Sequence, residues 1–171
     1  MATGMTAGEL KALLQLEPHP REGGWFRQTW RAAESIPANA LPARYAGSRS
    51  AGTAIYYLLE PDSFSEMHKL ASDEVFHFYL GDPVEMLQLW PNGGGRRVVL
   101  GRDIANGEML QTVVPQSVWQ GSRLVPGGKL ALLGCTVSPG FDYADYASGE
   151  RAQLLRGWPD WSDLIGVLTR R

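Results

Sequence analysis

The chain has 171 residues, of which 44% are hydrophobic and 20% are charged, and its formal net charge is −2. These values exclude a disordered chain and a basic nucleic-acid-binding domain, and the length suits one domain with a substantial core. No apolar run approaches the roughly 18 residues of a membrane span. Because the N-terminus also lacks the pattern of a secretory signal, we expect a cytoplasmic protein that binds neither membranes nor nucleic acid.

Glycine and proline are frequent, with 20 and 11 residues, and the chain has 6 Trp, 6 Tyr and 5 Phe. This composition favours a turn-rich β protein over a helical bundle. The single cysteine, Cys135, excludes an intramolecular disulfide and a multi-cysteine zinc site, and its apolar neighbours favour a packed thiol over a nucleophile.

The predicted helices lie at the two ends of the chain. Thr6 and Glu9 fit a capping box, so a short helix is expected within residues 1–17. Residues 32–52 have neither helical nor strand periodicity, which predicts a long loop. Another helix, packed on the outside, is expected within residues 158–171.

Between residues 53 and 140, apolar and aromatic runs alternate with turn signals such as the Asn-Gly pair at 106–107. This pattern, without intervening helical segments, predicts an antiparallel sandwich or barrel that forms the core of a single domain. The predicted strands are 25–31, 53–59, 74–80, 84–90, 96–100, 108–114 and 129–137.

Side chains that are able to bind a metal or transfer a proton are most concentrated in residues 65–81, which contain two of the three histidines and several carboxylates. Imidazole and carboxylate groups bind divalent metals and also act as general acids or bases. His68 and Glu74 can converge only if a turn lies between them, and residues 69–73 are able to supply it. The third histidine, His19, lies between two prolines in a predicted turn, where we expect a surface role.

Strand alternation constrains the neighbours of Glu74. Glu74, Phe76 and Phe78 share one face of their predicted strand, and His77 lies on the other face. If Glu74 points into a cavity, His77 points away from it unless a bulge intervenes. We therefore favour a core or interface role for His77, bonded to the backbone, and also keep it as a candidate ligand-binding residue.

Four segments together resemble one branch of the cupin superfamily, a family of unknown function. They are PHPREGGWFRQTW at 18–30, DEVFHFYLG at 73–81, VPQSVWQG at 114–121 and CTVSPGFDYADY at 135–146. His68, Glu74 and Gly81 fall in register with the first His, the Glu and the closing Gly of the general cupin motif, whereas Leu70 and Gln120 stand at two other histidine positions. The resemblance implies an all-β, antiparallel jelly-roll barrel with a ligand cavity, usually a homodimer, and no particular reaction.

Three functions are compatible with this resemblance. The first is binding of a small molecule, sugar-like or anionic, inside the barrel. Phe76 and Phe78, with Trp119 and Gln120 at the rim, would form its aromatic and polar lining, although aromatic residues in strands are more often plain core.

Arginines would bind an anionic ligand in this first interpretation. Of Arg27, Arg31 and Arg44, we favour Arg27, because it lies in the Phe-Arg pair of the segment that resembles the family. Arg31 and Arg44 are expected at a solvated surface.

The second function is a metal-free isomerase or epimerase of a nucleotide sugar or related compound. By similarity to cupin-type epimerases, His68 would act as the base, oriented by Asp73 or Glu74, and Tyr57 would return the proton from the opposite face.

The third function is a metal-assisted enzyme. The resemblance gives His68, Glu74 and Gln120 as candidate ligands for zinc, manganese, iron or nickel. Glutamine oxygen is a weak ligand and Leu70 is none, so much of the metal shell would be left to water. His77 would complete the set only by breaking the strand alternation.

Overall fold

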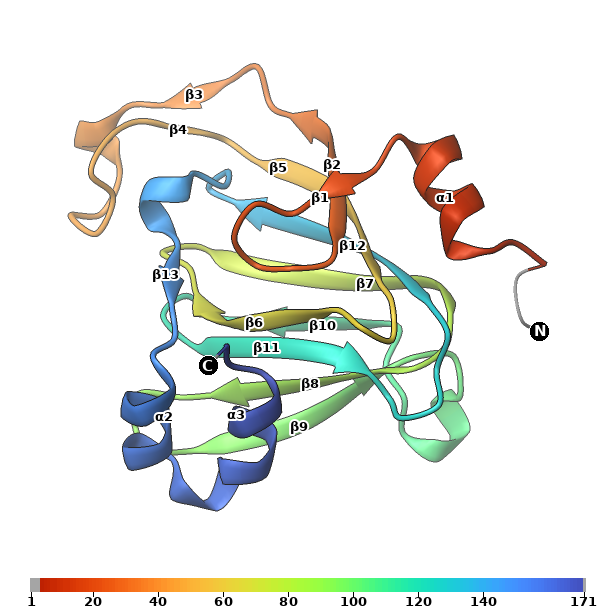
Figure 1. Ribbon diagram of the computed structural model, residues 1–171. Helices are drawn as coiled ribbons and strands as arrows, with labels where there is room; N and C mark the ends of the chain where they lie inside the picture. Colours follow the sequence, from red (N-terminus) through yellow and green to blue (C-terminus); the bar gives the residue numbers. More distant parts are fainter. Residues whose placement is uncertain (1–3, 171) are drawn as a thin grey trace.

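The computed structural model describes residues 4–170 as two antiparallel sheets that face each other (Figure 1). In spatial order, the six-stranded sheet contains β1 (Glu17–Pro18), β2 (Trp25–Arg31), β5 (Thr53–Leu59), β12 (Ala131–Ser138), β7 (Asp73–Gly81) and β10 (Gln111–Val114). The five-stranded sheet contains β13 (Ala147–Ser148), β6 (Phe64–Lys69), β11 (Trp119–Leu124), β8 (Val84–Leu89) and β9 (Gly95–Leu100). This arrangement confirms the all-β jelly-roll prediction.

The main hydrophobic core lies between the two sheets. Alternate residues of each strand point into it, so that Leu133 and Cys135 of β12 are buried there while Gly134 faces outward against the ring of Tyr79. Other side chains of this core include Tyr57, Leu59, Phe76, Phe78, Val84, Met86, Leu100, Val114 and Leu124.

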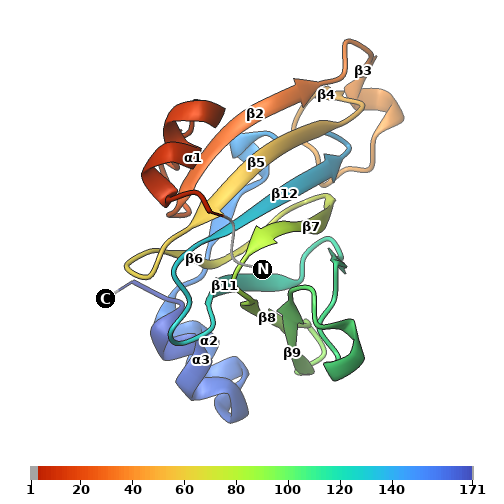
Figure 2. The ribbon, with the colours of Figure 1, turned by 90° about the vertical axis from the view of Figure 1, so that its right-hand side faces the viewer.

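Short helices cover the outer faces of the sheets (Figure 2). Helix α1 (Ala7–Leu14) begins at the predicted capping box, in which Thr6 and Glu9 bond each other, and it packs on the six-stranded sheet. The expected C-terminal helix is instead a pair, α2 (Arg151–Gly157) and α3 (Ser162–Val167), on the five-stranded sheet. Within residues 4–170, no helix is long and apolar enough to span a membrane.

Residues 32–52 are more ordered than the predicted loop. They contain a small hairpin of β3 (Ser35–Ile36) and β4 (Arg49–Ser50) and a turn of 3-10 helix at Ala38–Ala40. Arg49 anchors the segment, because its buried guanidinium donates two hydrogen bonds of 2.8 and 2.6 Å to Asp145. Such an anchor depends on a partner 96 residues away, which local periodicity does not reveal.

Strand β6 was absent from the predicted elements. Its inward positions carry polar side chains rather than the apolar residues that mark a half-buried strand, so its sequence lacks the expected alternation. The pairing of β6 with β11 also shifts register, so that Ser65 and His68 both lie opposite inward-facing residues of β11.

The outer face of the six-stranded sheet leaves several large side chains exposed, among them Trp30, Tyr79 and Val113. The homodimer implied by the family resemblance stays a prediction, and light scattering of the purified protein would test it.

Candidate functional site

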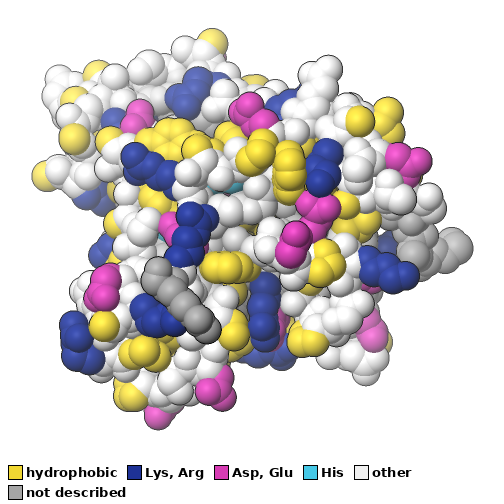
Figure 3. Space-filling view, viewed as in Figure 1, with side chains coloured by type: hydrophobic (Ala, Val, Ile, Leu, Met, Phe, Trp, Pro, Cys, Tyr) yellow, Lys and Arg dark blue, Asp and Glu magenta, His cyan; other side chains and the backbone are white. Residues whose placement is uncertain are grey.

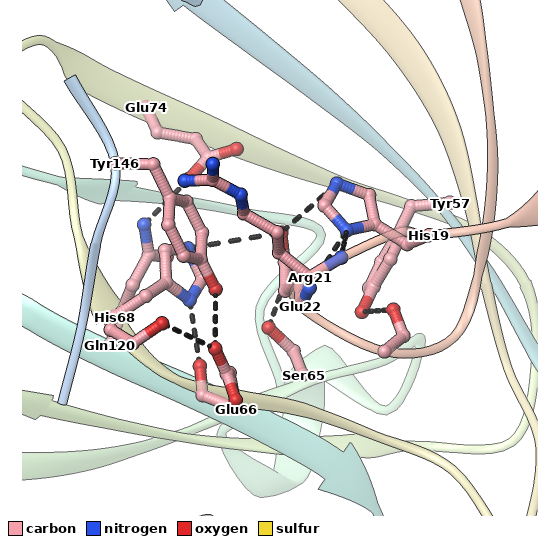
Figure 4. A network of polar contacts seen from close by, with 12 residues as sticks. His19, Arg21, Glu22, Tyr57, Ser65, Glu66, His68, Glu74, Gln120 and Tyr146 are labelled. Atoms are coloured by element: carbon pink, nitrogen blue, oxygen red, sulfur yellow. Dashed lines mark hydrogen bonds and ion pairs between the residues drawn. The ribbon is translucent and has the colours of Figure 1, made fainter. Parts of the chain in front are cut away.

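A cavity of about 330 Å³ lies at one end of the barrel. Strands β2, β5, β6, β7 and β12 and the loops next to them form the walls of this cavity. The lining residues include His19, Glu22, Phe26, Arg31, His68, Leu70, Glu74, Cys135, Phe141 and Tyr143. In the space-filling view a histidine is visible only deep within a hollow of the surface (Figure 3). The polar side chains of the site and its surroundings converge from separate elements (Figure 4).

His68 is oriented as a base. Its side chain is almost fully buried, and Nδ1 lies 2.7 Å from the carbonyl oxygen of Glu66. Because a carbonyl only accepts hydrogen bonds, Nδ1 carries the hydrogen and the lone pair of the neutral ring is on Nε2. The ring of Tyr146 stacks on the imidazole at 4.9 Å, which fixes its plane.

His19 lies in the cavity, so the expected surface role is wrong. Its side chain is only 5% exposed, and its Nδ1 accepts a 2.8 Å hydrogen bond from the backbone N–H of Glu22. In the neutral ring the hydrogen is therefore on Nε2, the opposite tautomer from His68. Burial is the main cause that lowers the pKa of His19, which favours this neutral form.

Glu22 lies between the two imidazoles and was not among the predicted site residues. Its Oε2 is 3.7 Å from Nε2 of His19 and 3.9 Å from Nε2 of His68, and its Oε1 accepts a 2.5 Å hydrogen bond from Ser65. The only sequence signal for Glu22 was its place in the PHPREGG segment of the family resemblance.

The loop that carries His19 and Glu22 is fastened to both sheets. The hydroxyl of Tyr57 on β5 donates to the carbonyl of Gly23 at 2.7 Å, and the backbone N–H of Glu66 on β6 donates to the carbonyl of Glu22 at 2.9 Å. Gly23 has a φ of 101°, and a side chain there would collide with the carbonyl of Phe64.

Glu74 points inward from β7, as strand alternation predicts, and is buried. The amide nitrogen of Gln120 donates a 2.6 Å hydrogen bond to its Oε2. Burial, followed by the nearby charge of Glu22, raises the pKa of Glu74 to about 7. Glu74 is thus able both to give and to accept a proton near neutral pH.

The predicted metal ligands do not fit a metal centre. Gln120 presents its amide nitrogen to Glu74, so it holds the carboxylate in place, and its Oε1 is buried without a hydrogen-bond partner. Among residues 4–170, no three His, Cys, Asp or Glu side chains are grouped closely enough to bind an ion. The set of His68, Glu74 and Gln120 is therefore not supported for zinc, manganese, iron or nickel.

Three aromatic residues predicted at the cavity have other places. Phe76 and Phe78 face inward but pack in the main core, outside the cavity lining. Trp119 precedes the inward-facing Gln120, so it faces the opposite way and packs beneath the C-terminal helices. Its proposed position at the rim was wrong because neighbouring strand residues point to opposite faces.

Tyr57 does not line the cavity either, although it was predicted to return a proton. Its buried hydroxyl is committed to Gly23, and burial raises its pKa well above the usual value. Tyr57 therefore holds the loop rather than meeting a ligand.

His77 and Asp73 lie outside the cavity lining. His77 is on the outer face of β7, where its ring nitrogens contact Thr136 and Gln111 at 3.1 and 3.0 Å. Its partners are thus side chains, whereas a backbone partner was expected. Asp73 accepts a hydrogen bond from the backbone of Gln116 and is exposed, so it does not orient His68.

Of the three arginines, Arg31 rather than Arg27 lines the cavity, and Arg44 is exposed outside the cavity as expected. Arg27 faces outward and donates to Gln15, and Arg44 donates to the carbonyl of Ala71. Arg31 lines the cavity and donates to the carbonyl of Phe141 at 3.1 Å. A register shift between Gln28 and Trp30 places Arg31 on the inner face, which simple alternation from Phe26 would not do.

Replacing Tyr57 with phenylalanine is expected to lower the free energy of unfolding by about 1 kcal/mol, because the variant loses one buried hydrogen bond and leaves the Gly23 carbonyl unpaired. Urea denaturation measures this change. A ligand that binds the cavity should retain its affinity within about threefold if only the loop anchor is weakened. Full stability in the variant would contradict the assigned role of the hydroxyl.

The jelly roll and its polar cavity define a protein of the cupin type. The family described as Cupin superfamily (DUF985) matches residues 9–148, and the chain belongs to this family. An uncharacterized protein of Saccharomyces cerevisiae is 31% identical over 161 residues, which cover 89% of this chain and 76% of the yeast protein.

Solved structures agree with this assignment. A hypothetical protein from Leishmania major has 32% identity and a TM-score of 0.87, with 98% of this chain and 100% of that chain covered. Protein SO0799 from Shewanella oneidensis has 30% identity and a TM-score of 0.85, with 97% and 98% covered. Oxalate decarboxylase from Bacillus subtilis has 12% identity and a TM-score of 0.52, with 91% of this chain and 37% of that chain covered. At this identity the similarity shows the fold alone.

Proposed function

We propose that this protein is an isomerase or epimerase that binds a small carbonyl compound in the barrel cavity and moves a proton on the carbon next to the carbonyl. The observation that carries the proposal is the pair of oppositely oriented imidazoles. Nε2 of His68 offers a lone pair, Nε2 of His19 offers a hydrogen, and both flank Glu22 in one cavity.

His68 would take the proton from carbon, and its imidazole would become positively charged. Glu22 Oε2, 3.9 Å from Nε2, would stabilise that charge. The electrons of the broken C–H bond would move onto the carbonyl oxygen, where the Nε2–H of His19 is suited to donate a hydrogen bond.

Glu74 would complete the reaction from the other sheet. Its pKa of about 7 leaves a substantial protonated fraction at neutral pH, so it is able to return a proton to carbon. His68 lies on β6 and Glu74 on β7, which gives an acid and a base on separate walls of the cavity.

Exchange with solvent deuterium tests the proposal directly. Chelator-treated protein would be incubated in D₂O with small hydroxyketones, oxo acids and aminoketones, and loss of the C–H signal followed by ¹H NMR. We expect exchange in at least one compound class, beyond the rate without protein. Absence of catalysed exchange across all three classes would contradict the proposal.

A further inference from the structure

We infer that the ligand of the cavity carries a positively charged nitrogen, which Glu22 binds and the aromatic residues at the mouth surround. This inference specifies the substrate class of the proposed function, on which it rests. The sequence predicts a sugar-like or anionic ligand, and this inference excludes the anionic one.

The charge of the lining favours a cation. Four carboxyl side chains line the cavity, whereas the only guanidinium among its described lining residues, Arg31, is exposed and donates to a backbone carbonyl. His19 is buried and favours its neutral form, so it does not balance this excess of acidic over basic side chains. The four acids are Glu17, Glu22, Glu74 and Asp142.

The hydrogen-bonding groups of the interior favour a donor. Oε2 of Glu22 has two imidazole contacts, of 3.7 and 3.9 Å, and both are too long for hydrogen bonds. The lone pair on Nε2 of buried His68 is left for the proton that leaves carbon in the proposed reaction, because the hydrogen of its ring is on Nδ1. Oε2 of Glu22 therefore has room to accept from the ligand, and an ammonium group suits it because it has several hydrogens and no lone pair.

Aromatic rings provide the remaining surface. Phe141 and Tyr143 line the cavity with ring centres 5.0 Å apart in an edge-to-face arrangement, and Phe26 lines the β2 wall. The faces of such rings attract cations. The guanidinium of Arg21 lies 5.3 Å from the centre of the Tyr143 ring, so this surface already accepts a cation from the chain itself.

Three probes of similar size and different charge test the inference on the wild-type protein. Benzylammonium, benzyl alcohol and benzoate would be titrated into protein labelled with ¹⁵N-histidine, and the ring signals of His19 and His68 followed. We expect benzylammonium to bind at least about tenfold more tightly than benzyl alcohol, because a charge-assisted hydrogen bond replaces a neutral one, and benzoate to bind most weakly.

Two variants locate the preference. Glu22→Gln should reduce the ratio between benzylammonium and benzyl alcohol to near one, whereas Glu34→Gln, which removes an exposed carboxylate outside the cavity, should leave the ratio unchanged. The wild-type comparison stands by itself if Glu22→Gln does not fold.

Equal or tighter binding of benzyl alcohol or benzoate would overturn the inference, as would failure of all three probes to bind. Exchange of neutral or anionic carbonyl compounds that depends on His68, without an ammonium preference, would overturn the cation inference and leave the proposed reaction intact. A preference for benzylammonium without exchange of any compound would overturn the proposed reaction and leave the cation inference intact.

Discussion

Replacement of His68 with glutamine is expected to reduce solvent deuterium exchange at least about 100-fold, the lower range for loss of a general base. Glutamine retains an N–H that is able to donate to the Glu66 carbonyl, as Nδ1 of His68 does, but it has no nitrogen lone pair to take a proton. The rate of C–H signal loss by ¹H NMR, at saturating compound, measures the effect.

His77→Gln is the matched control, because it makes the same chemical change on the outer face of β7. Its exchange rate should stay within about twofold of the wild type, since general-base catalysis requires contact with the reacting proton. Equal melting temperatures of the two variants would exclude a difference in folding. A His68→Gln protein that exchanges at the wild-type rate would remove His68 from the reaction.

Glu74→Gln is expected to change how stability depends on pH. Burial raises the pKa of Glu74 from 4.5 to about 7, so the folded protein binds this proton more tightly than the unfolded chain does. The Glu74 contribution to the free energy of unfolding therefore falls as the pH rises from about 4.5 to about 7, and is constant above that range. The full change corresponds to about 3 kcal/mol.

Urea denaturation between pH 4 and pH 8 measures this effect as the difference between the variant and the wild type. Glu74→Gln keeps an oxygen that accepts from Gln120, and its advantage over the wild type should grow by up to about 3 kcal/mol as the pH rises through that range. Glu34→Gln, at an exposed position, should follow the wild-type curve. Parallel curves for Glu74→Gln and the wild type would show that Glu74 titrates normally.

The fold was predictable where the chain obeys simple periodicity. Apolar alternation and turn residues identified most barrel strands, and the same alternation placed Glu74 inward and His77 outward. The motifs at 18–30 and 135–146 also indicated the family to which the chain belongs. Strand β6 was not predicted, because its inward residues are the polar side chains of the site and the apolar alternation that marks a strand is missing there.

The site was less predictable because distant segments build it. His19 and Glu22 belong to a loop whose backbone and side chains bond to β6, more than 40 residues later in the chain. A histidine between two prolines gives no local sign that such a loop folds inward. The position predicted for Trp119 was wrong for a different reason. Trp119 and Gln120 are adjacent in β11, so their side chains point to opposite faces of the sheet.

The register shift in β2 also bears on how substrate choice is able to change within this fold. One additional residue near Thr29 lets Phe26 and Arg31 face the same ligand space, although they are five positions apart, while the pairs with β5 continue on both sides of the shift. If β2 paired without this shift, Thr29 would lie opposite Ala54 and Trp30 opposite Thr53, so a tryptophan would take the inner position of Arg31. The position of one extra residue along β2 thus decides which side chain reaches the ligand space, while the pairs that precede it, from Trp25 to Gln28, stay the same.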